Sequence, residues 1–225
     1  MTERTVQADG WDQLLTWWRQ LGERGREEGD CAAWMEGLYR HLEGELQGLD
    51  RSLIACGPGC ASCCVVQVAV LMPEAIALVR YVRKIESSHP GAGLKARVDA
   101  LHGTLGGLDE QARLQLQLPC AFLSEQGCCL IYPLRPLMCR SVSSTDPASC
   151  RAALSIPDAA EAPPVVMQLQ QKQLCDQAFI TLADALREQG LDDRSTSLQT
   201  AAYQLLRQPE LAATWLQGGA VPQGG

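Results

Sequence analysis

Apolar residues recur every three to four positions along most of the chain, which is the spacing of amphipathic helices. Two such helices are predicted in the N-terminal fifth, over about residues 11–22 and about residues 30–53. The apolar face of the second helix is formed by Trp34, Leu38, Leu42, Leu46 and Leu49. Because an amphipathic helix normally buries its apolar face, we expect these side chains in the core.

Helical and irregular patterns alternate through the rest of the chain. The β-branched segment at residues 65–70 is typical of a short strand, and Pro73 suits the first turn of a helix that ends near Ser87. Helical spacing returns over residues 91–118, where glycines interrupt it, and over residues 166–217. The sequence therefore predicts a mainly α fold with at most a few short strands.

The composition excludes several classes of protein. The 225 residues are 46% apolar and 20% charged, which is typical of a globular protein. The net charge is −7 and no run of Lys or Arg exceeds two residues, so we expect no nucleic-acid partner. No apolar run approaches the ~20 residues of a transmembrane helix, and the polar N-terminus is unlike a signal peptide. We therefore expect no membrane partner and a cytoplasmic location.

Cysteine usage is the unusual feature of this composition. The chain has 11 cysteines, and most of them fall into two blocks. In a reducing compartment such clusters indicate metal or redox chemistry rather than disulfides. Thiolates are soft ligands, which suit zinc, iron–sulfur centres or copper(I). The first block is Cys56, Cys60, Cys63 and Cys64, and the second is Cys120, Cys129, Cys139 and Cys150.

The spacing within the blocks leaves the number of metal centres open. Cys63 and Cys64 are adjacent and point in different directions, so this pair does not easily chelate one ion. Eight thiolates match either two four-thiolate sites or one polynuclear centre. Concentrated thiolate charge also needs nearby donors and cations. We therefore predict that Arg135, Arg140 and Arg151, which lie in or beside the second block, surround the centre and donate to sulfur.

The remaining cysteines are assigned different roles. Cys31 and Cys175 lie within helical patterns, so we expect them to be buried as small apolar residues. Cys128 adjoins Cys129 and is an alternative to it as a ligand. None of the three histidines lies near either block, and we do not predict them as ligands.

The two blocks and their context resemble the YkgJ-type cysteine-cluster family, whose domains are described as chelating zinc or iron through a CxxCxxCC-type motif. Besides the first block, the resemblance rests on PCAFL at residues 119–123, GxCxIY at 127–132 and RPxxCR at 135–140. It covers about residues 52–155 and implies Cys129 rather than Cys128 as the ligand. The implied ligands are Cys56, Cys60, Cys63, Cys64, Cys120, Cys129, Cys139 and Cys150.

Three functions are compatible with these features. The first is a metal-binding protein that holds zinc or an iron–sulfur centre in a structural, metal-handling or redox role. The second is an iron–sulfur enzyme of redox or methyl-transfer type, since flagellin lysine methylases carry a similar motif. The third is a helical interaction protein stabilised by its metal. The first is the leading hypothesis, and no catalytic residue is predicted.

A radical S-adenosylmethionine enzyme is a weaker form of the second hypothesis. The first three cysteines of the first block have the bare spacing of that signature. However, a helical pattern precedes Cys56, whereas the motif of those enzymes follows a strand. An aromatic residue usually precedes the third cysteine, and here Ser62 occupies that position.

The predicted organisation is a helical scaffold around a loop-built, cysteine-rich metal site. An N-terminal helical segment occupies residues 1–51, and the cysteine-cluster core occupies residues 52–155. A C-terminal helical segment, residues 156–217, packs on this core. Residues 218–225 form a flexible tail.

Overall fold

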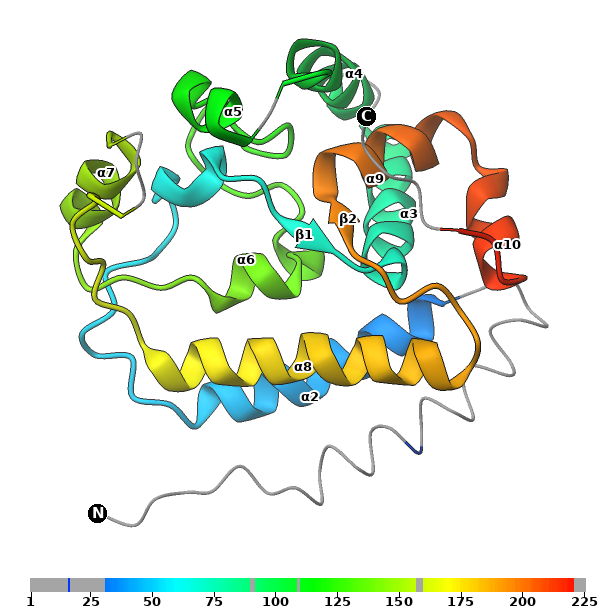
Figure 1. The fold of residues 1–225 in the computed structure, drawn as a ribbon, viewed down its shortest axis with the longest axis horizontal. Helices are drawn as coiled ribbons and strands as arrows, with labels where there is room; N and C mark the ends of the chain where they lie inside the picture. The colour runs from blue at the N-terminus through cyan, green and yellow to red at the C-terminus, as the bar shows by residue number, and fades with distance from the viewer. Residues whose placement is uncertain (1–15, 17–30, 90–91, 109, 157–159, 221–225) are drawn as a thin grey trace.

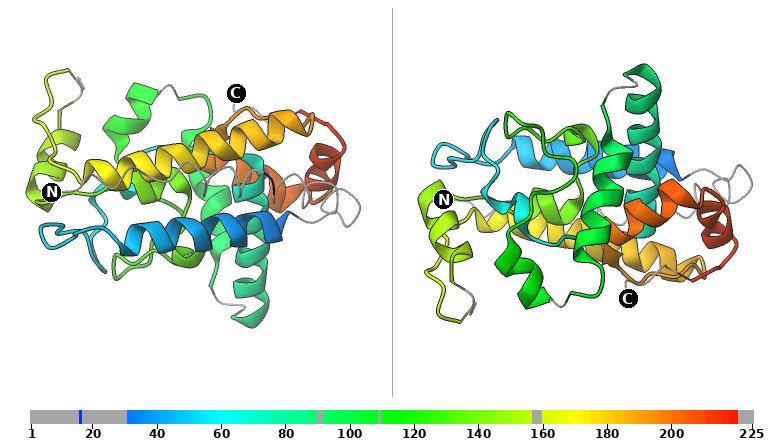
Figure 2. Two further views of the ribbon diagram at one scale, coloured as in Figure 1. Left: turned by 90° about the horizontal axis from the view of Figure 1, so that it is seen from below. Right: turned by 90° about the horizontal axis from the view of Figure 1, so that it is seen from above.

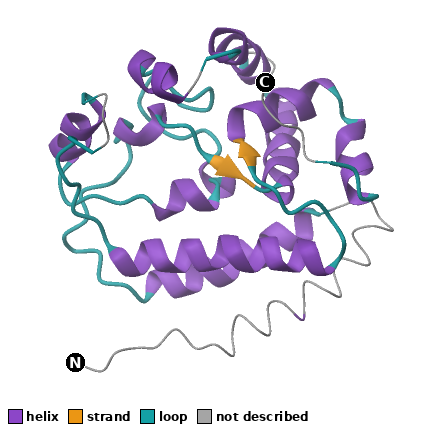
Figure 3. Cartoon of the chain, in the orientation of Figure 1, coloured by secondary structure: helices purple, strands orange, loops and turns teal. Residues whose placement is uncertain are grey.

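The computed structural model of the chain describes residue 16 and residues 31–89, 92–108, 110–156 and 160–220. Within these residues the fold is mainly α, as the sequence predicts, and the only sheet has two strands (Figure 1, Figure 3). None of the described helices is long and apolar enough to cross a membrane.

The elements follow one another with short connections. The helices are α2 (Ala32–Gln47), α3 (Met72–Ser88), α4 (Leu94–Leu105), α5 (Glu110–Leu116), α6 (Leu137–Ser141), α7 (Pro147–Leu154), α8 (Leu169–Glu188), α9 (Leu198–Arg207) and α10 (Glu210–Leu216). Two short 3-10 helices lie among them, η1 (Ser62–Val65) and η2 (Tyr132–Leu134). Strands β1 (Ala69–Val70) and β2 (Thr196–Ser197) pair antiparallel.

Helices α2 and α8 lie side by side along the long axis of the molecule (Figure 1, Figure 2). The predicted apolar face of α2 is buried at Trp34, Leu38, Leu42 and Leu46. Helix α2 ends at Gln47, earlier than the pattern indicates, and Asp50 then turns the chain by accepting a hydrogen bond from the Ser52 N–H. The helix expected over residues 11–22 lies outside the described residues.

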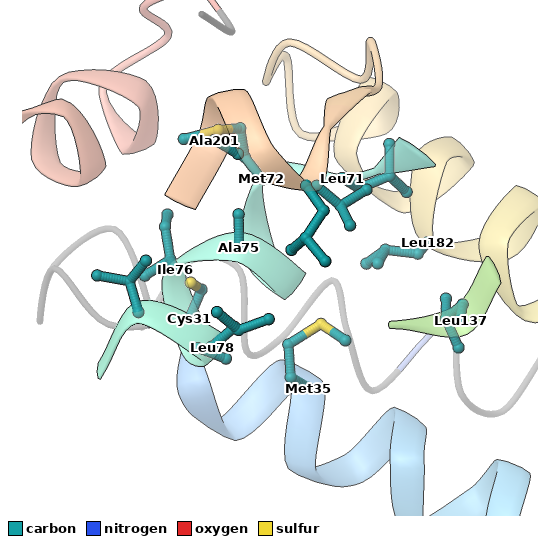
Figure 4. Packing of buried hydrophobic residues seen from close by; sticks show 14 of the residues in the cluster. Cys31, Met35, Leu71, Met72, Ala75, Ile76, Leu78, Leu137, Leu182 and Ala201 are labelled. Carbon is teal, nitrogen blue, oxygen red and sulfur yellow. The ribbon is translucent and has the colours of Figure 1, made fainter. Parts of the chain in front are cut away.

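Helix α3 contributes the most deeply buried part of the core. It begins with Pro73 in its first turn, as predicted, and ends at Ser88. Figure 4 shows this part of the core, where α3 meets α2, α6, α8 and α9 around Cys31, Met35, Leu71, Met72, Ala75, Ile76, Leu78, Leu137, Leu182 and Ala201. Cys31 and Cys175 are both fully buried, as expected.

Much of the cysteine-rich region lies at one end of this helical body. Helix α7 and η1 occupy the left of Figure 1, whereas α10 lies at the opposite end. Helix α6 packs along α8 and connects the cysteine-rich region to the body. The strand expected at residues 65–70 is shorter than predicted, because Val65 belongs to η1 and only Ala69 and Val70 pair with β2.

Candidate metal centre

A Gly-Pro-Gly turn shapes the first cysteine block. The Cys60 N–H donates to the Gly57 carbonyl at 3.0 Å, and Gly59 has a φ of +85°, which disfavours any residue with a side chain. The single 3-10 turn η1 follows and carries Cys63 and Cys64 in succession. Consecutive residues of such a turn point about 120° apart, but the thiols of Cys63 and Cys64 stay within hydrogen-bonding reach of each other.

The second block begins in a loop that lies directly against the first block. The Cys120 N–H donates to the Cys64 carbonyl at 2.7 Å, which joins the two blocks through the backbone. Gly127, with a φ of +73°, lies so close to Gly59 that an added Cβ would stand 2.9 Å from the Gly59 carbonyl oxygen. Cys129 follows in an isolated β-bridge.

Cys139 and Cys150 lie on two short helices. Helix α6 carries Cys139 and packs on α8, and α7 carries Cys150 and contacts η1. The Asp146 carboxylate caps α7 by accepting hydrogen bonds from its first-turn N–H groups. The Cys56 Sγ lies 3.9 Å from the Ser144 carbonyl, so the first block also contacts the segment that leads into α7.

One group of thiols forms where the first block meets α7. Burial raises the pKa of the Cys56 thiol. Three neighbouring thiols raise it further, because thiolates repel one another, namely those of Cys60, Cys63 and Cys150. All four cysteines are partly exposed. Residues from opposite ends of the cysteine-rich region therefore lie within electrostatic reach of each other.

A second group of thiols forms around Cys64 and α6. Burial raises the pKa of Cys120 to about 11 and that of Cys139 to about 12. The nearby thiol of Cys129 raises the pKa values of both. The thiols of Cys120 and Cys129 also act on Cys64. Like the cysteines of the first group, all four cysteines here are partly exposed.

Cys63 and Cys64 stand between the two groups. A hydrogen bond from the Cys64 thiol to Cys63 lowers the pKa of Cys63 to about 6, and the charge of Arg135 lowers it as well. The same bond raises the pKa of Cys64 far above its ordinary value. Cys63 also lies within electrostatic reach of Cys129 and Cys139. The adjacent pair therefore has neighbours in both groups and connects them.

Two of the three predicted arginines lie beside these thiols. Arg135 donates a hydrogen bond to the Cys139 carbonyl, and its charge partly offsets the rise in pKa of the Cys139 thiol. Its charge acts in the same direction on Cys129. Arg140 donates to the Arg135 carbonyl at 2.7 Å and so helps to fix the backbone at Arg135. Arg151 is exposed on α7.

A buried carboxylate, which the sequence did not single out, fixes the helix that carries Cys139. Glu74 is 1% exposed, and its oxygens accept hydrogen bonds from the Leu71 N–H at 3.0 Å and the Leu137 N–H at 2.8 Å. Burial raises the pKa of Glu74 to about 7, although both N–H donors act against this rise. In the sequence, Pro73 and Glu74 indicate the start of a helix. Nothing there indicates the hydrogen bond from the Leu137 N–H of α6 to Glu74.

The side chains of Tyr39 on α2 and Arg140 on α6 lie near the Glu74 carboxylate. The Tyr39 hydroxyl is buried beside it without a hydrogen bond of ordinary geometry, and burial raises the pKa of Tyr39. The Arg140 guanidinium lies 4.7 Å from the centre of the Tyr39 ring and forms an ion pair with Glu43 at 3.3 Å. Helix α2 therefore contacts Arg140 through both Tyr39 and Glu43.

The thiols of the two groups are the donors that a soft metal ion prefers, but they lie too far apart to hold an ion as they stand. Among the residues that the structure describes, no three Cys, His, Asp or Glu side chains form a group that could hold a metal ion as they stand. The thiols are partly buried, and Arg135 supplies compensating charge. Cys128, in contrast to Cys129, is exposed. An ion bound here would have to draw the thiols closer together.

Comparison with known families gives one match. Residues 55–176 match the CxxCxxCC family, described as a putative zinc- or iron-chelating domain. Because the match covers more than half of the 225 residues, the chain belongs to this family, as the cysteine motifs predict. The matched region extends past both blocks into α8. Neither the curated proteins nor the solved structures gave a match.

Proposed function

We propose that this member of the CxxCxxCC family binds zinc or an iron–sulfur centre through the thiolates of both blocks. The observation that carries the proposal is the meeting of two blocks that are far apart in the sequence. The backbone bond between Cys64 and Cys120 joins them, and the thiol of Cys63 lies within reach of Cys139. The proposed ligands are Cys56, Cys60, Cys63, Cys64, Cys120, Cys129, Cys139 and Cys150.

The buried cysteines of the same chain provide an internal comparison. Cys31 and Cys175 are fully enclosed by the core, which is how cysteine behaves as a small apolar residue. The proposed ligands are partly exposed, and most lie on loops and single helical turns. Such positions contribute little to a core, so packing does not account for eight thiols there. Metal ligation accounts for both their number and their convergence.

The proposed role follows from what the metal would hold together. Metal–thiolate bonds would link η1, the loop of Cys120 and Cys129, α6 and α7, which are all short elements. Bound zinc would supply a redox-inert cross-link, and an iron–sulfur centre would supply one-electron chemistry. Arg135 would offset thiolate charge, and Arg140 would keep Arg135 in position.

Metal analysis of anaerobically purified protein tests this proposal. We expect zinc, or iron with acid-labile sulfide, in the wild-type protein and a large loss of metal in Cys63→Ala and Cys139→Ala. Cys128→Ala is the matched control, because Cys128 is exposed and adjoins a proposed ligand. Its metal content should equal that of the wild type. Wild-type protein without metal, or variants that all retain it, would contradict the proposal.

A further inference from the structure

We infer that a cavity between α4, α5 and α9 binds a small molecule through an anionic oxygen group, either a phosphate or a carboxylate. The cavity has a volume of about 230 Å³, which is below the ~300–1,000 Å³ of pockets for drug-sized ligands. No cysteine is among its described lining residues, so this site is independent of the proposed metal function. Six polar side chains line it, those of His102, Arg113, Ser197, Gln199, Thr200 and Gln204.

Three helices build the walls of this cavity, and all three lie in the upper half of Figure 1. Helix α4 packs on α9, and the Gln199 side-chain amide of α9 donates to the Val98 carbonyl of α4 at 2.8 Å. Arg113 of α5 donates to the Leu105 carbonyl at the end of α4 at 3.2 Å. Hydrogen bonds between helices therefore fix the walls of the cavity.

Arg113 brings to the cavity a positive charge that has no carboxylate partner among the described residues. Its guanidinium donates to the Leu105 carbonyl and to the Gln67 side-chain oxygen, and both acceptors are neutral. Its Nε is buried without a hydrogen-bond partner. A guanidinium has more N–H donors than these two bonds use, and its hydrogen bonds to phosphate or carboxylate oxygens are among the strong ones. An anionic ligand would therefore supply what Arg113 lacks.

The other charged groups near the cavity cancel each other. Arg207 and Asp99 form an ion pair at 3.1 Å. His102 stacks on the Tyr203 ring, with the ring centres 3.7 Å apart. Burial and the charge of Arg113 lower the pKa of His102, which favours the neutral imidazole. Arg113 is therefore left as the net charge beside the cavity, and it is positive.

The start of α9 adds polar groups to the same cavity. Ser197 caps α9 by accepting a hydrogen bond from the Thr200 N–H at 3.0 Å. The Ser197 hydroxyl donates to the Thr200 Oγ1 at 2.8 Å, so the hydroxyl hydrogen of the buried Thr200 stays available to a ligand. The N-terminus of a helix also carries a partial positive charge. Hydroxyl and helix dipole therefore favour the same kind of ligand as Arg113, a molecule with an anionic oxygen group.

Titration of the full chain with inorganic phosphate and, separately, with acetate tests this inference. Isotope-labelled protein is followed by NMR at constant ionic strength. We expect saturable shifts of the residues that line the cavity with at least one of the two anions. Arg113→Gln should weaken this binding by about tenfold. Arg187→Gln is the matched control, because it removes the same charge from an exposed arginine that pairs with Asp184 and Asp193.

A second pair of variants tests the site by adding charge. Gln204→Glu keeps the size of a lining side chain and places a carboxylate in the cavity, so it should also weaken binding by about tenfold or more. Gln208→Glu adds the same charge at an exposed position just beyond α9 and should bind like the wild type. If Arg113→Gln does not fold, this pair decides the question.

Two results would overturn the inference. The wild type could show no saturable binding of either anion at the cavity, or a cavity variant could bind as tightly as its control. None of the four substitutions changes a cysteine, so the metal content of each variant should equal that of the wild type. Failure of anion binding would therefore leave the proposed metal function standing, and absence of metal would leave the cavity site standing.

Discussion

The helical body and the cysteine-rich region are stabilised in different ways. Helix α3 alone buries a run of consecutive residues from Met72 to Val79, and α8 and α9 add further apolar side chains. By contrast, η1, η2 and α7 contain no buried residue. Burial of apolar surface therefore stabilises the body, whereas the cysteine-rich region adds fewer side chains to the core, among them Phe122, Ile131 and Leu137, and relies more on backbone hydrogen bonds. A region with so little core gains most from metal cross-links.

Removal of the metal should have the largest effect of all, and it should destabilise the cysteine-rich region far more than the helical body. A metal that binds only the folded state stabilises it by about 4 kcal/mol when its free concentration exceeds Kd about a thousandfold. Chelation should therefore lower the melting temperature and increase hydrogen exchange in η1, α6 and α7. Amides of α2 and α8 should keep most of their protection. Equal loss of protection in both regions would show that the two are not stabilised separately.

Glu74 links the two regions, and its ionisation should make stability depend on pH. Its pKa is 4.5 in the unfolded chain and about 7 in the folded protein, where burial raises it. Between these values the folded state holds a proton that the unfolded state has lost, so stability falls as the pH rises. The contribution is about 3 kcal/mol, present below pH 4.5 and lost by about pH 7.

Urea unfolding of the metal-free, reduced protein measures this contribution. Wild type and Glu74→Gln should differ in the slope of stability against pH between 4.5 and 7, because the amide does not titrate. Glu45→Gln is the control, since Glu45 is exposed on α2. Parallel pH profiles for wild type and Glu74→Gln would contradict the buried, proton-holding state of this carboxyl group.

Gly127→Ala should separate the two cysteine blocks without removing a thiol. The positive φ at Gly127 disfavours alanine, and its Cβ would collide with the Gly59 carbonyl oxygen at 2.9 Å. We expect a loss of about 2 kcal/mol in stability together with weaker metal binding. Gly57→Ala is the matched control, because no atom lies within 4 Å of a Cβ there. Similar metal affinities for the two variants would show that this contact does not hold the blocks together.

Arg135→Gln should have the smallest effect of this series. Its charge lies near Cys63, Cys129 and Cys139, so its loss should weaken metal binding by about tenfold. Arg151→Gln is the control, since Arg151 is exposed on α7. Competition with a coloured chelator measures both affinities. Equal affinities for the two variants would show that Arg135 does not contribute to metal binding.

The sequence predicted the elements that depend on local pattern. The buried face of α2 and the start of α3 at Pro73 follow from helical spacing and from the preference of proline for a first turn. The family also followed from the cysteine spacing and is confirmed by the match over residues 55–176. In each case the signal lies within a few neighbouring residues or within a fixed motif.

The features that the sequence did not predict depend on contacts between distant residues. The second hydrogen bond of Glu74, to the Leu137 N–H, joins residues 63 positions apart. The close approach of Gly127 to Gly59 likewise joins residues that are far apart in the sequence. Periodicity carries no information about such pairs, so the spacing of the cysteines left the number of centres open.

X-ray absorption at the metal edge would identify the atoms that bind the metal. The measurement would use wild-type protein purified without oxygen, with no metal added. We predict zinc or iron surrounded by sulfur alone, with metal–sulfur distances of about 2.3 Å. A metal bound mainly by nitrogen or oxygen, or protein without metal, would contradict ligation by the two cysteine blocks.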